Sequence, residues 1–120
     1  MVITEKIFFD LNRARIKTRS QPVLNAVAAI LKAHADLRVS IEGHTDDQGT
    51  ADWNRELSRL RSERVREYLI KKGIAADRLE SKGFGSDRPL VQGVSEAARD
   101  QNRRVEFVII GRMPEAGVTP

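Results

Sequence analysis

Hydrophobic positions recur with two different periods along the chain, and the change of period marks the expected elements. Between residues 37 and 42 every second position is apolar, namely Leu37, Val39 and Ile41, which is typical of a strand with one buried and one polar face. Between residues 51 and 72 apolar positions recur every three or four residues, which is typical of an amphipathic helix. The pattern therefore predicts a strand, a short polar loop and a long helix in succession.

Capping residues and the remaining apolar segments complete the expected fold. Ser20 is suited to cap an earlier helix with Pro22 in its first turn, Gly73 is suited to end the long helix, and Ser95 is suited to cap a brief turn through Asp100. Further strands are expected at residues 3–9, 79–83 and 104–110. Because strands and helices alternate, we expect an α/β (α+β) two-layer sandwich with a four-stranded sheet and both main helices on one face.

Length and composition favour a single domain. With 120 residues, of which 40% are hydrophobic, the chain is large enough for one core, and we assign residues 1–110 to the domain and 111–120 to a flexible C-terminal tail. The absence of cysteine excludes disulfides and thiolate sites. No apolar run approaches the ~20 residues that cross a bilayer, and no signal-peptide pattern is present, so membrane association is expected only through segments absent from this chain.

The formal net charge of +4 does not indicate a nucleic-acid partner. Basic and acidic residues are interleaved along the long helix, as in Arg55-Glu56 and Arg66-Glu67. Such alternation is typical of a solvated helix face with ion pairs between successive turns. We therefore expect no nucleic-acid binding.

The candidate chemistry lies in the loop after the central strand and in the helix that follows it. Asp46 comes directly after the strand, and Arg61 falls on the apolar arc of the helix. A guanidinium buried without an anion costs several kcal/mol, so we expect Asp46 to be its partner, either directly or through a shared ligand. A structural salt bridge is the alternative interpretation.

Several short motifs occur in a fixed order along most of the chain. They are Phe9-Asp10, Gly43-His44-Thr45-Asp46, Asn54, Leu57-Ser58, Arg61, Gly83-Phe84-Gly85 and Asn102-Arg103-Arg104-Val105-Glu106. With these motifs, residues 3–110 resemble the OmpA-like C-terminal domain, which also occurs in peptidoglycan-associated lipoproteins and in flagellar stator proteins of the MotB type. The resemblance implies a mixed sheet in β-α-β-α-β-β order.

The same resemblance implies non-covalent binding of the peptidoglycan stem peptide through meso-diaminopimelate. Asp46 would accept the ligand's ammonium group and Arg61 would bind its carboxylate, a match that agrees with the chemistry of both side chains. The implied ligand-binding residues are Asp46, Arg61, Thr45, Phe9, Asp10, Asn54 and Leu57. Arg64 and Ala98 depart from the usual pattern. The implied location is the periplasm of a Gram-negative bacterium, as part of an outer-membrane protein, a lipoprotein or an inner-membrane-anchored protein, and a homodimer is left open.

Other interpretations of the loop are weaker. His44 beside Asp46 and Asp47 suggests a metal site, but only two histidines and no thiols are present, so we expect a hydrogen-bonded loop histidine, no metal and no cofactor. Adjacent aspartates are more typical of a turn than of a glycosidase acid pair. We therefore expect a binding module that anchors an envelope protein to the cell wall. We expect it to have no catalytic residues and not to be an enzyme. The rival hypothesis is a structural protein-interaction or dimerisation domain of the same fold without ligand binding.

Overall fold

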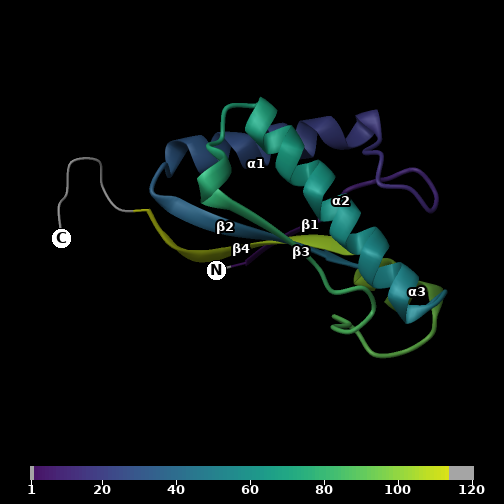
Figure 1. Ribbon diagram of the computed structural model, residues 1–120. Helices are drawn as coiled ribbons and strands as arrows, with labels where there is room; N and C mark the ends of the chain where they lie inside the picture. The colour runs from purple at the N-terminus through teal and green to yellow at the C-terminus, as the bar shows by residue number, and fades with distance from the viewer. Residues whose placement is uncertain (1, 114–120) are drawn as a thin grey trace.

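The structure is a computed structural model that describes residues 2–113, and it shows two layers, with helices over one face of a sheet (Figure 1). The strands are β1 (Val2–Glu5), β2 (Leu37–His44), β3 (Leu79–Gly83) and β4 (Arg104–Arg112), the helices are α1 (Gln21–Ala33), α2 (Ala51–Lys71) and α3 (Glu96–Asn102), and 3-10 turns occur at Thr18–Ser20 and Ala76–Arg78. The sheet order is β1-β4-β2-β3, with β2 parallel to β3 and the other two pairs antiparallel. The predicted α+β fold and mixed sheet are confirmed.

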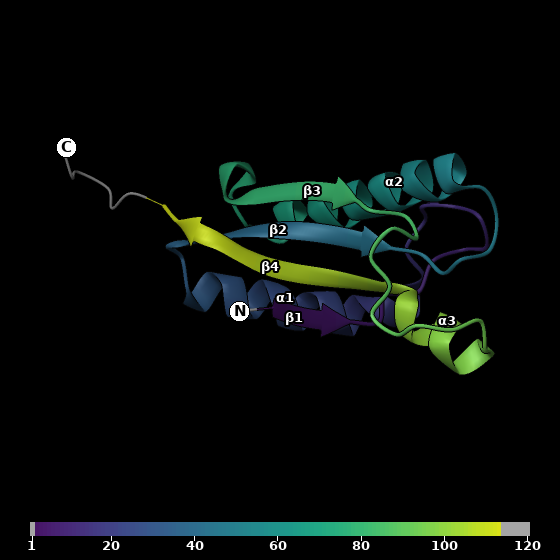
Figure 2. The same ribbon diagram turned by 90° about the horizontal axis from the view of Figure 1, so that it is seen from below.

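The loops that follow β1, β2 and β3 gather at one end of the sheet, beside α3 (Figure 2). This arrangement follows from the topology, because β1, β2 and β3 point in one direction and β4 points in the other. Residues far apart in the sequence therefore meet at this end.

The ends of two strands and the cap of one helix differ from the prediction. The first strand ends at Glu5 rather than Phe9, because the chain leaves the sheet and the Phe8 amide donates to the Ser20 hydroxyl at 2.7 Å. Ser20 is therefore occupied and makes no capping hydrogen bond to α1. The last strand continues through Gly111 to Arg112, two residues that the prediction assigned to the tail. The rest of the predicted tail, residues 114–120, lies outside the described residues.

Helix α2 lies unusually close to the sheet because small residues face one another there. A Cβ atom at Gly83 would lie 2.2 Å from the backbone nitrogen of Arg59, and one at Gly43 would lie 2.7 Å from the carbonyl oxygen of Ser58. The Ser62 hydroxyl donates to the Lys82 carbonyl at 2.8 Å across the same contact. This close packing fixes the position of α2, and therefore of Arg61, relative to the ends of β2 and β3.

At the other end of the sheet, a buried arginine connects α1 to β2. Arg78 donates hydrogen bonds to the carbonyls of Leu31, His34 and Leu37 at 3.0 Å or less, so it satisfies acceptors at the end of α1 and the start of β2.

Within residues 2–113, none of the helices combines the length and the apolar character that crossing a membrane requires.

Candidate ligand-binding site

Arg61 extends from α2 toward the loop that follows β1. Its Nε donates to the carbonyl of Arg13 at 2.9 Å, its Nη2 donates to the carbonyl of Asp10 at 3.3 Å, and its guanidinium lies 4.7 Å from the centre of the Phe9 ring. In the part of the chain that the structure describes, no carboxylate forms an ion pair with it. Burial lowers the pKa of Arg61, because desolvation disfavours the charged guanidinium. The site therefore contains a partly buried cation whose protein partners are neutral.

Asp46 is buried at the end of β2 and is already bound on both oxygens. Its Oδ1 accepts from the Gln48 amide at 2.9 Å, and its Oδ2 accepts from Nη1 of Arg103 at 2.7 Å. Of the two expected arrangements, the direct pair between Asp46 and Arg61 is therefore wrong, because Arg103 occupies that place. The reason is the antiparallel pairing of β2 with β4, which puts the residues just before β4 beside those just after β2.

Neighbouring residues hold the Asp46 loop in place. The Thr45 amide donates to the Gly85 carbonyl at 2.8 Å, and the Thr45 hydroxyl donates to the Asp46 carbonyl at 3.0 Å. Asn54, buried in the first turn of α2, donates to the Gln48 carbonyl at 2.8 Å. The loop is thus held by the segment that follows β3 and by α2, so these contacts fix the position of Asp46.

The predicted residues do not share one cavity. Arg61 and Phe9 line a cleft of about 290 Å³ that Lys6, Asp100, Arg103 and Arg104 also line. Thr45 and Asp46 line a separate hollow of about 230 Å³ beneath the loop at residues 86–94, and Leu57 lines a third hollow beside Trp53. Asp10 reaches Arg61 through its backbone carbonyl and not through its carboxylate.

Arg103 links the first two spaces, because its side chain lines the cleft while it binds Asp46. The Asn102-Arg103-Arg104 motif does not indicate which acidic residue Arg103 binds, so the sequence alone did not predict this role. With four cationic side chains and one acidic side chain in its lining, the cleft is suited to an anionic ligand.

One known protein family matches most of this chain. The model of the OmpA family matches residues 8–103. The chain belongs to the OmpA family. This confirms the resemblance that the sequence motifs indicated.

Relatives of this OmpA-family domain include a peptidoglycan-associated lipoprotein of Brucella melitensis, 30% identical over 91% of this chain and 65% of that protein. The peptidoglycan-binding protein ArfA of Mycobacterium bovis is 38% identical over 86% of this chain and 32% of its own length. The crystal structure of the peptidoglycan-associated lipoprotein from Burkholderia pseudomallei has a TM-score of 0.78 and 32% identity, covering 87% of this chain and 88% of that one. The chain spans less than two thirds of the first curated relatives it matches.

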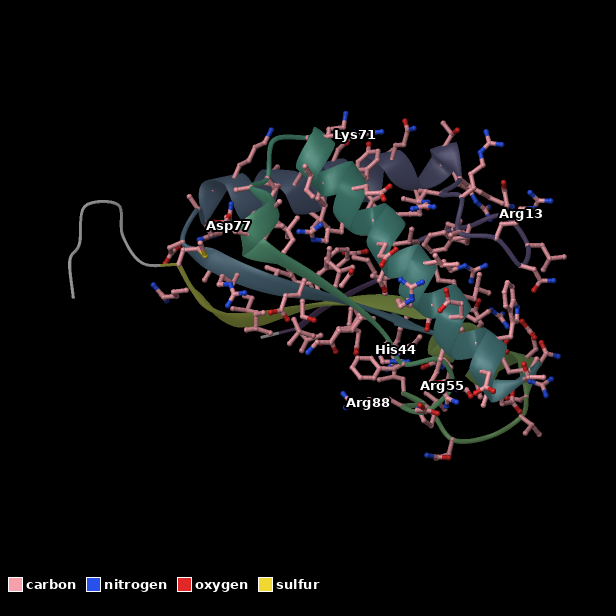
Figure 3. All side chains as sticks on the ribbon, in the orientation of Figure 1. Arg13, His44, Arg55, Lys71, Asp77 and Arg88 are labelled. Carbon is pink, nitrogen blue, oxygen red and sulfur yellow. The ribbon has the colours of Figure 1, made fainter. Side chains whose placement is uncertain are left out.

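His44 lies on the opposite face of the sheet from the helices of this OmpA-family domain. It is the last residue of β2, near Arg88 (Figure 3), and its ring stacks on Phe84 at a centroid distance of 5.4 Å. Its Nε2 lies 3.1 Å from Oε2 of Glu106, but the alignment does not make a hydrogen bond, and neither ring nitrogen has a hydrogen-bond partner within residues 2–113. The expected hydrogen-bonded loop histidine is therefore wrong. Burial, and then Arg104, lower the pKa of His44 against the opposing effects of Glu106 and Glu42.

Proposed function

We propose that this domain binds peptidoglycan non-covalently through the diaminopimelate head group of the stem peptide and thereby anchors an envelope protein to the cell wall in the periplasm. Membership of the OmpA family and the names of two relatives, a peptidoglycan-associated lipoprotein and a peptidoglycan-binding protein, support the polymer as the ligand. The site residues support a ligand that carries both a carboxylate and an ammonium group.

The observation that carries the proposal is that the Arg61 guanidinium has no carboxylate partner within residues 2–113. The guanidinium is partly buried in the cleft, its hydrogen bonds within residues 2–113 go to two carbonyls, and its Nη1 has no acceptor among those residues. A partly desolvated guanidinium binds a carboxylate well, because the planar fork offers two parallel donors. The ligand carboxylate accordingly binds Arg61 from the open side of the cleft.

The ammonium group of the ligand binds Asp46, which remains part of the proposed site. Because Oδ2 of Asp46 already accepts from Arg103, the ammonium shares this carboxylate with the arginine, whose other terminal nitrogen pairs with Glu96. Thr45 and Asn54 support the loop, and Phe9 forms the apolar wall beside Arg61. A site of this size gives modest affinity, and many tethers acting on one polymer raise the total.

Calorimetric titration with a diaminopimelate-containing muropeptide tests the proposal. Loss of a charge-assisted hydrogen-bonding group costs roughly 1.5–3 kcal/mol, so Arg61→Ala is expected to weaken binding about 10- to 150-fold. Asp46→Asn is expected to weaken it as well. Arg64→Ala is the matched control, because Arg64 lies one turn further along α2 and pairs only with Glu67 within residues 2–113. Unchanged affinity in both Arg61→Ala and Asp46→Asn would contradict the proposal.

Specificity for diaminopimelate requires a separate comparison. A muropeptide with lysine in place of diaminopimelate keeps the ammonium but lacks the second carboxylate. We expect the unaltered domain to bind this lysine muropeptide weakly. Its affinity should equal that of the Arg61→Ala variant for the diaminopimelate muropeptide. Sedimentation with purified sacculi tests binding to the intact polymer, and free diaminopimelate should compete. A domain with a purely structural role would stay in the supernatant, and an enzyme would release soluble fragments, which we do not expect.

A further inference from the structure

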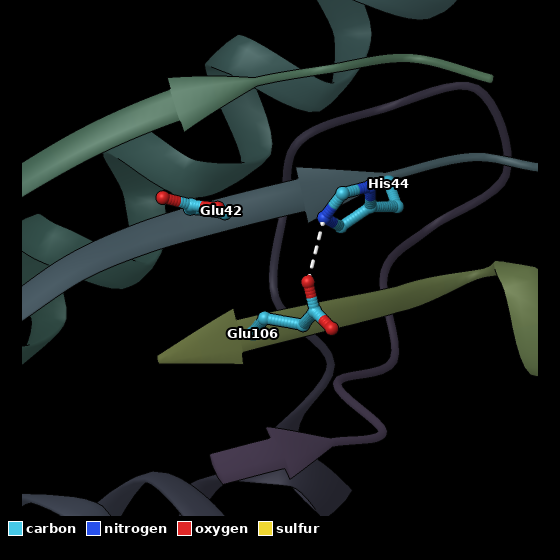
Figure 4. Close-up of side chains that lie close together, drawn as sticks. All are labelled: Glu42, His44 and Glu106. Carbon is cyan, nitrogen blue, oxygen red and sulfur yellow. Dashed lines mark ion pairs between the residues drawn. The ribbon is translucent and has the colours of Figure 1, made fainter. Parts of the chain in front are cut away.

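Three ligand-type side chains meet on the face of the sheet that α1 and α2 leave uncovered. Glu42 and His44 come from β2 and Glu106 comes from β4 (Figure 4). One donor atom from each residue lies within 4.8 Å of the others, and Nε2 of His44 is 3.1 Å from Oε2 of Glu106. None of the three side chains takes part in the proposed carboxylate and ammonium contacts.

Nearby cations in the described part of the chain do not neutralise both carboxylates of this cluster. Glu42 and Glu106 are directly opposite in the β2–β4 register, a placement that destabilises a sheet when both are ionised. Of the two carboxylates, Arg104 pairs with Glu106, with 3.5 Å between its Nε and Oε1, and in the described part of the chain that Nε has no hydrogen-bond acceptor. Glu42 forms no ion pair within residues 2–113.

The imidazole gives an independent indication of a missing ligand. The side chain of His44 is only 1% exposed, and neither of its ring nitrogens has a hydrogen-bond partner in the described part of the chain. An unsatisfied buried polar group is costly, so its persistence here requires a reason. Nε2 faces the carboxylate of Glu106 across the cluster (Figure 4).

We propose that Glu42, His44 and Glu106 bind one divalent transition-metal ion of the zinc type. Imidazole nitrogen with two carboxylate oxygens is a donor set that zinc accepts, whereas magnesium and calcium prefer oxygen ligands alone. Zinc lies about 2.0–2.2 Å from such ligands, so donor atoms around one ion are roughly 3–4 Å apart, and a small rotation of the partly exposed glutamates closes the present spacing. Three protein ligands leave a further position for water.

This proposal departs from the expectation of no metal site, which rested on His44 with Asp46 and Asp47. Those aspartates point elsewhere, Asp46 toward Arg103 and Asp47 toward Arg99. Glu106 becomes a neighbour of His44 only through the pairing of β2 with β4. A bound ion would join these strands immediately before the Asp46 loop, on the face of the sheet that α1 and α2 leave uncovered.

Titration of chelator-treated domain with zinc chloride alone tests the inference. We expect one ion per chain, with Glu42→Gln and Glu106→Gln each weakening zinc binding by at least about tenfold, as removal of a ligand costs no less than removal of an outer-shell partner. His34→Gln is the matched control because His34 is the only other histidine in the sequence and lies at the C-cap of α1. It should leave zinc binding unchanged, and magnesium should not compete at equal concentration.

A second measurement separates a metal site from a structural role of the same residues. The ring-nitrogen NMR shift of His44 should move on zinc addition in the unaltered domain and in His34→Gln. At the same zinc concentration it should move less in Glu106→Gln, whose fold is checked by circular dichroism. If Glu106→Gln does not fold, the same comparison uses Glu42→Gln. No stoichiometric zinc binding, affinity unchanged by both glutamate substitutions, or affinity lost in His34→Gln would each overturn the inference. Peptidoglycan binding is measured independently, so its failure would leave this result unaffected.

Discussion

Replacing Gly83 by alanine tests the close contact between α2 and the sheet. The added Cβ would lie 2.2 Å from the backbone nitrogen of Arg59, 2.6 Å from its Cα and 2.7 Å from Oγ of Ser58. Ordinary contacts begin near 3.4 Å, and backbone atoms cannot rotate away, so α2 must move by roughly 1 Å.

The cost has two parts. Overpacking of this kind typically costs about 1–3 kcal/mol. The displacement also strains two hydrogen bonds across the contact, from Ser62 Oγ to the Lys82 carbonyl and from the Gly85 amide to Ser58 Oγ, at about 1 kcal/mol each. We expect a total of about 3 kcal/mol or more, a large part of the ~5–15 kcal/mol typical of a domain.

Urea unfolding followed by the fluorescence of Trp53, the single tryptophan, measures this loss. With a slope of about 1–3 kcal/mol per molar urea, the midpoint should fall by more than about 1 M. Ser81→Ala is the control, because Ser81 lies two residues earlier on the same face of β3 and the change adds no atoms. If Gly83→Ala unfolds within about 0.5 kcal/mol of the unaltered domain, α2 moves freely over the sheet and the argument that it fixes Arg61 fails.

Three further predictions concern other parts of the fold. Arg78→Met leaves three carbonyls without their donor and should destabilise the domain by about 2–4 kcal/mol in urea unfolding. Asn102→Ala removes the acceptor for the amides of residues 90 and 91, so amide hydrogen exchange should accelerate in that loop while the core stays protected. Burial and Arg104 depress the pKa of His44 below its ordinary 6.5. As the pH falls, the unfolded chain therefore takes up a proton at this histidine before the folded domain does. The stability that the neutral histidine contributes is present above about pH 6.5 and is lost as the pH falls from there toward the folded pKa. With chelator present, stability should fall less between about pH 7.5 and about pH 5 in His44→Gln than in the unaltered domain, and equal slopes would refute this assignment.

Local patterns in the sequence predict most of the elements, whereas contacts between distant segments decide the rest. The change from a period of two to a period near 3.6 correctly located β2 and α2, since each period reflects burial of one face. The end of β1 was missed because the Phe8 amide leaves the sheet for the Ser20 hydroxyl, a contact without a local signal.

The same limit applies to the candidate site. Arg61 was found because an arginine on an apolar helical arc is conspicuous, and Asp46 because it follows a strand. Arg103 and Glu106 acquire their partners only when β4 pairs with β2 in a particular register. Charge alone did not identify which of the many arginines faces Asp46.

The position of β1 determines how the domain responds to mechanical load. β1 borders the sheet and pairs only with β4, and residues 6–9, directly after it, form part of the cleft wall. A pulling force between residue 2 and a ligand held in the cleft therefore acts along the strand, in shear. All four residue pairs between β1 and β4 then resist together, whereas a force across the sheet edge would peel them apart one at a time.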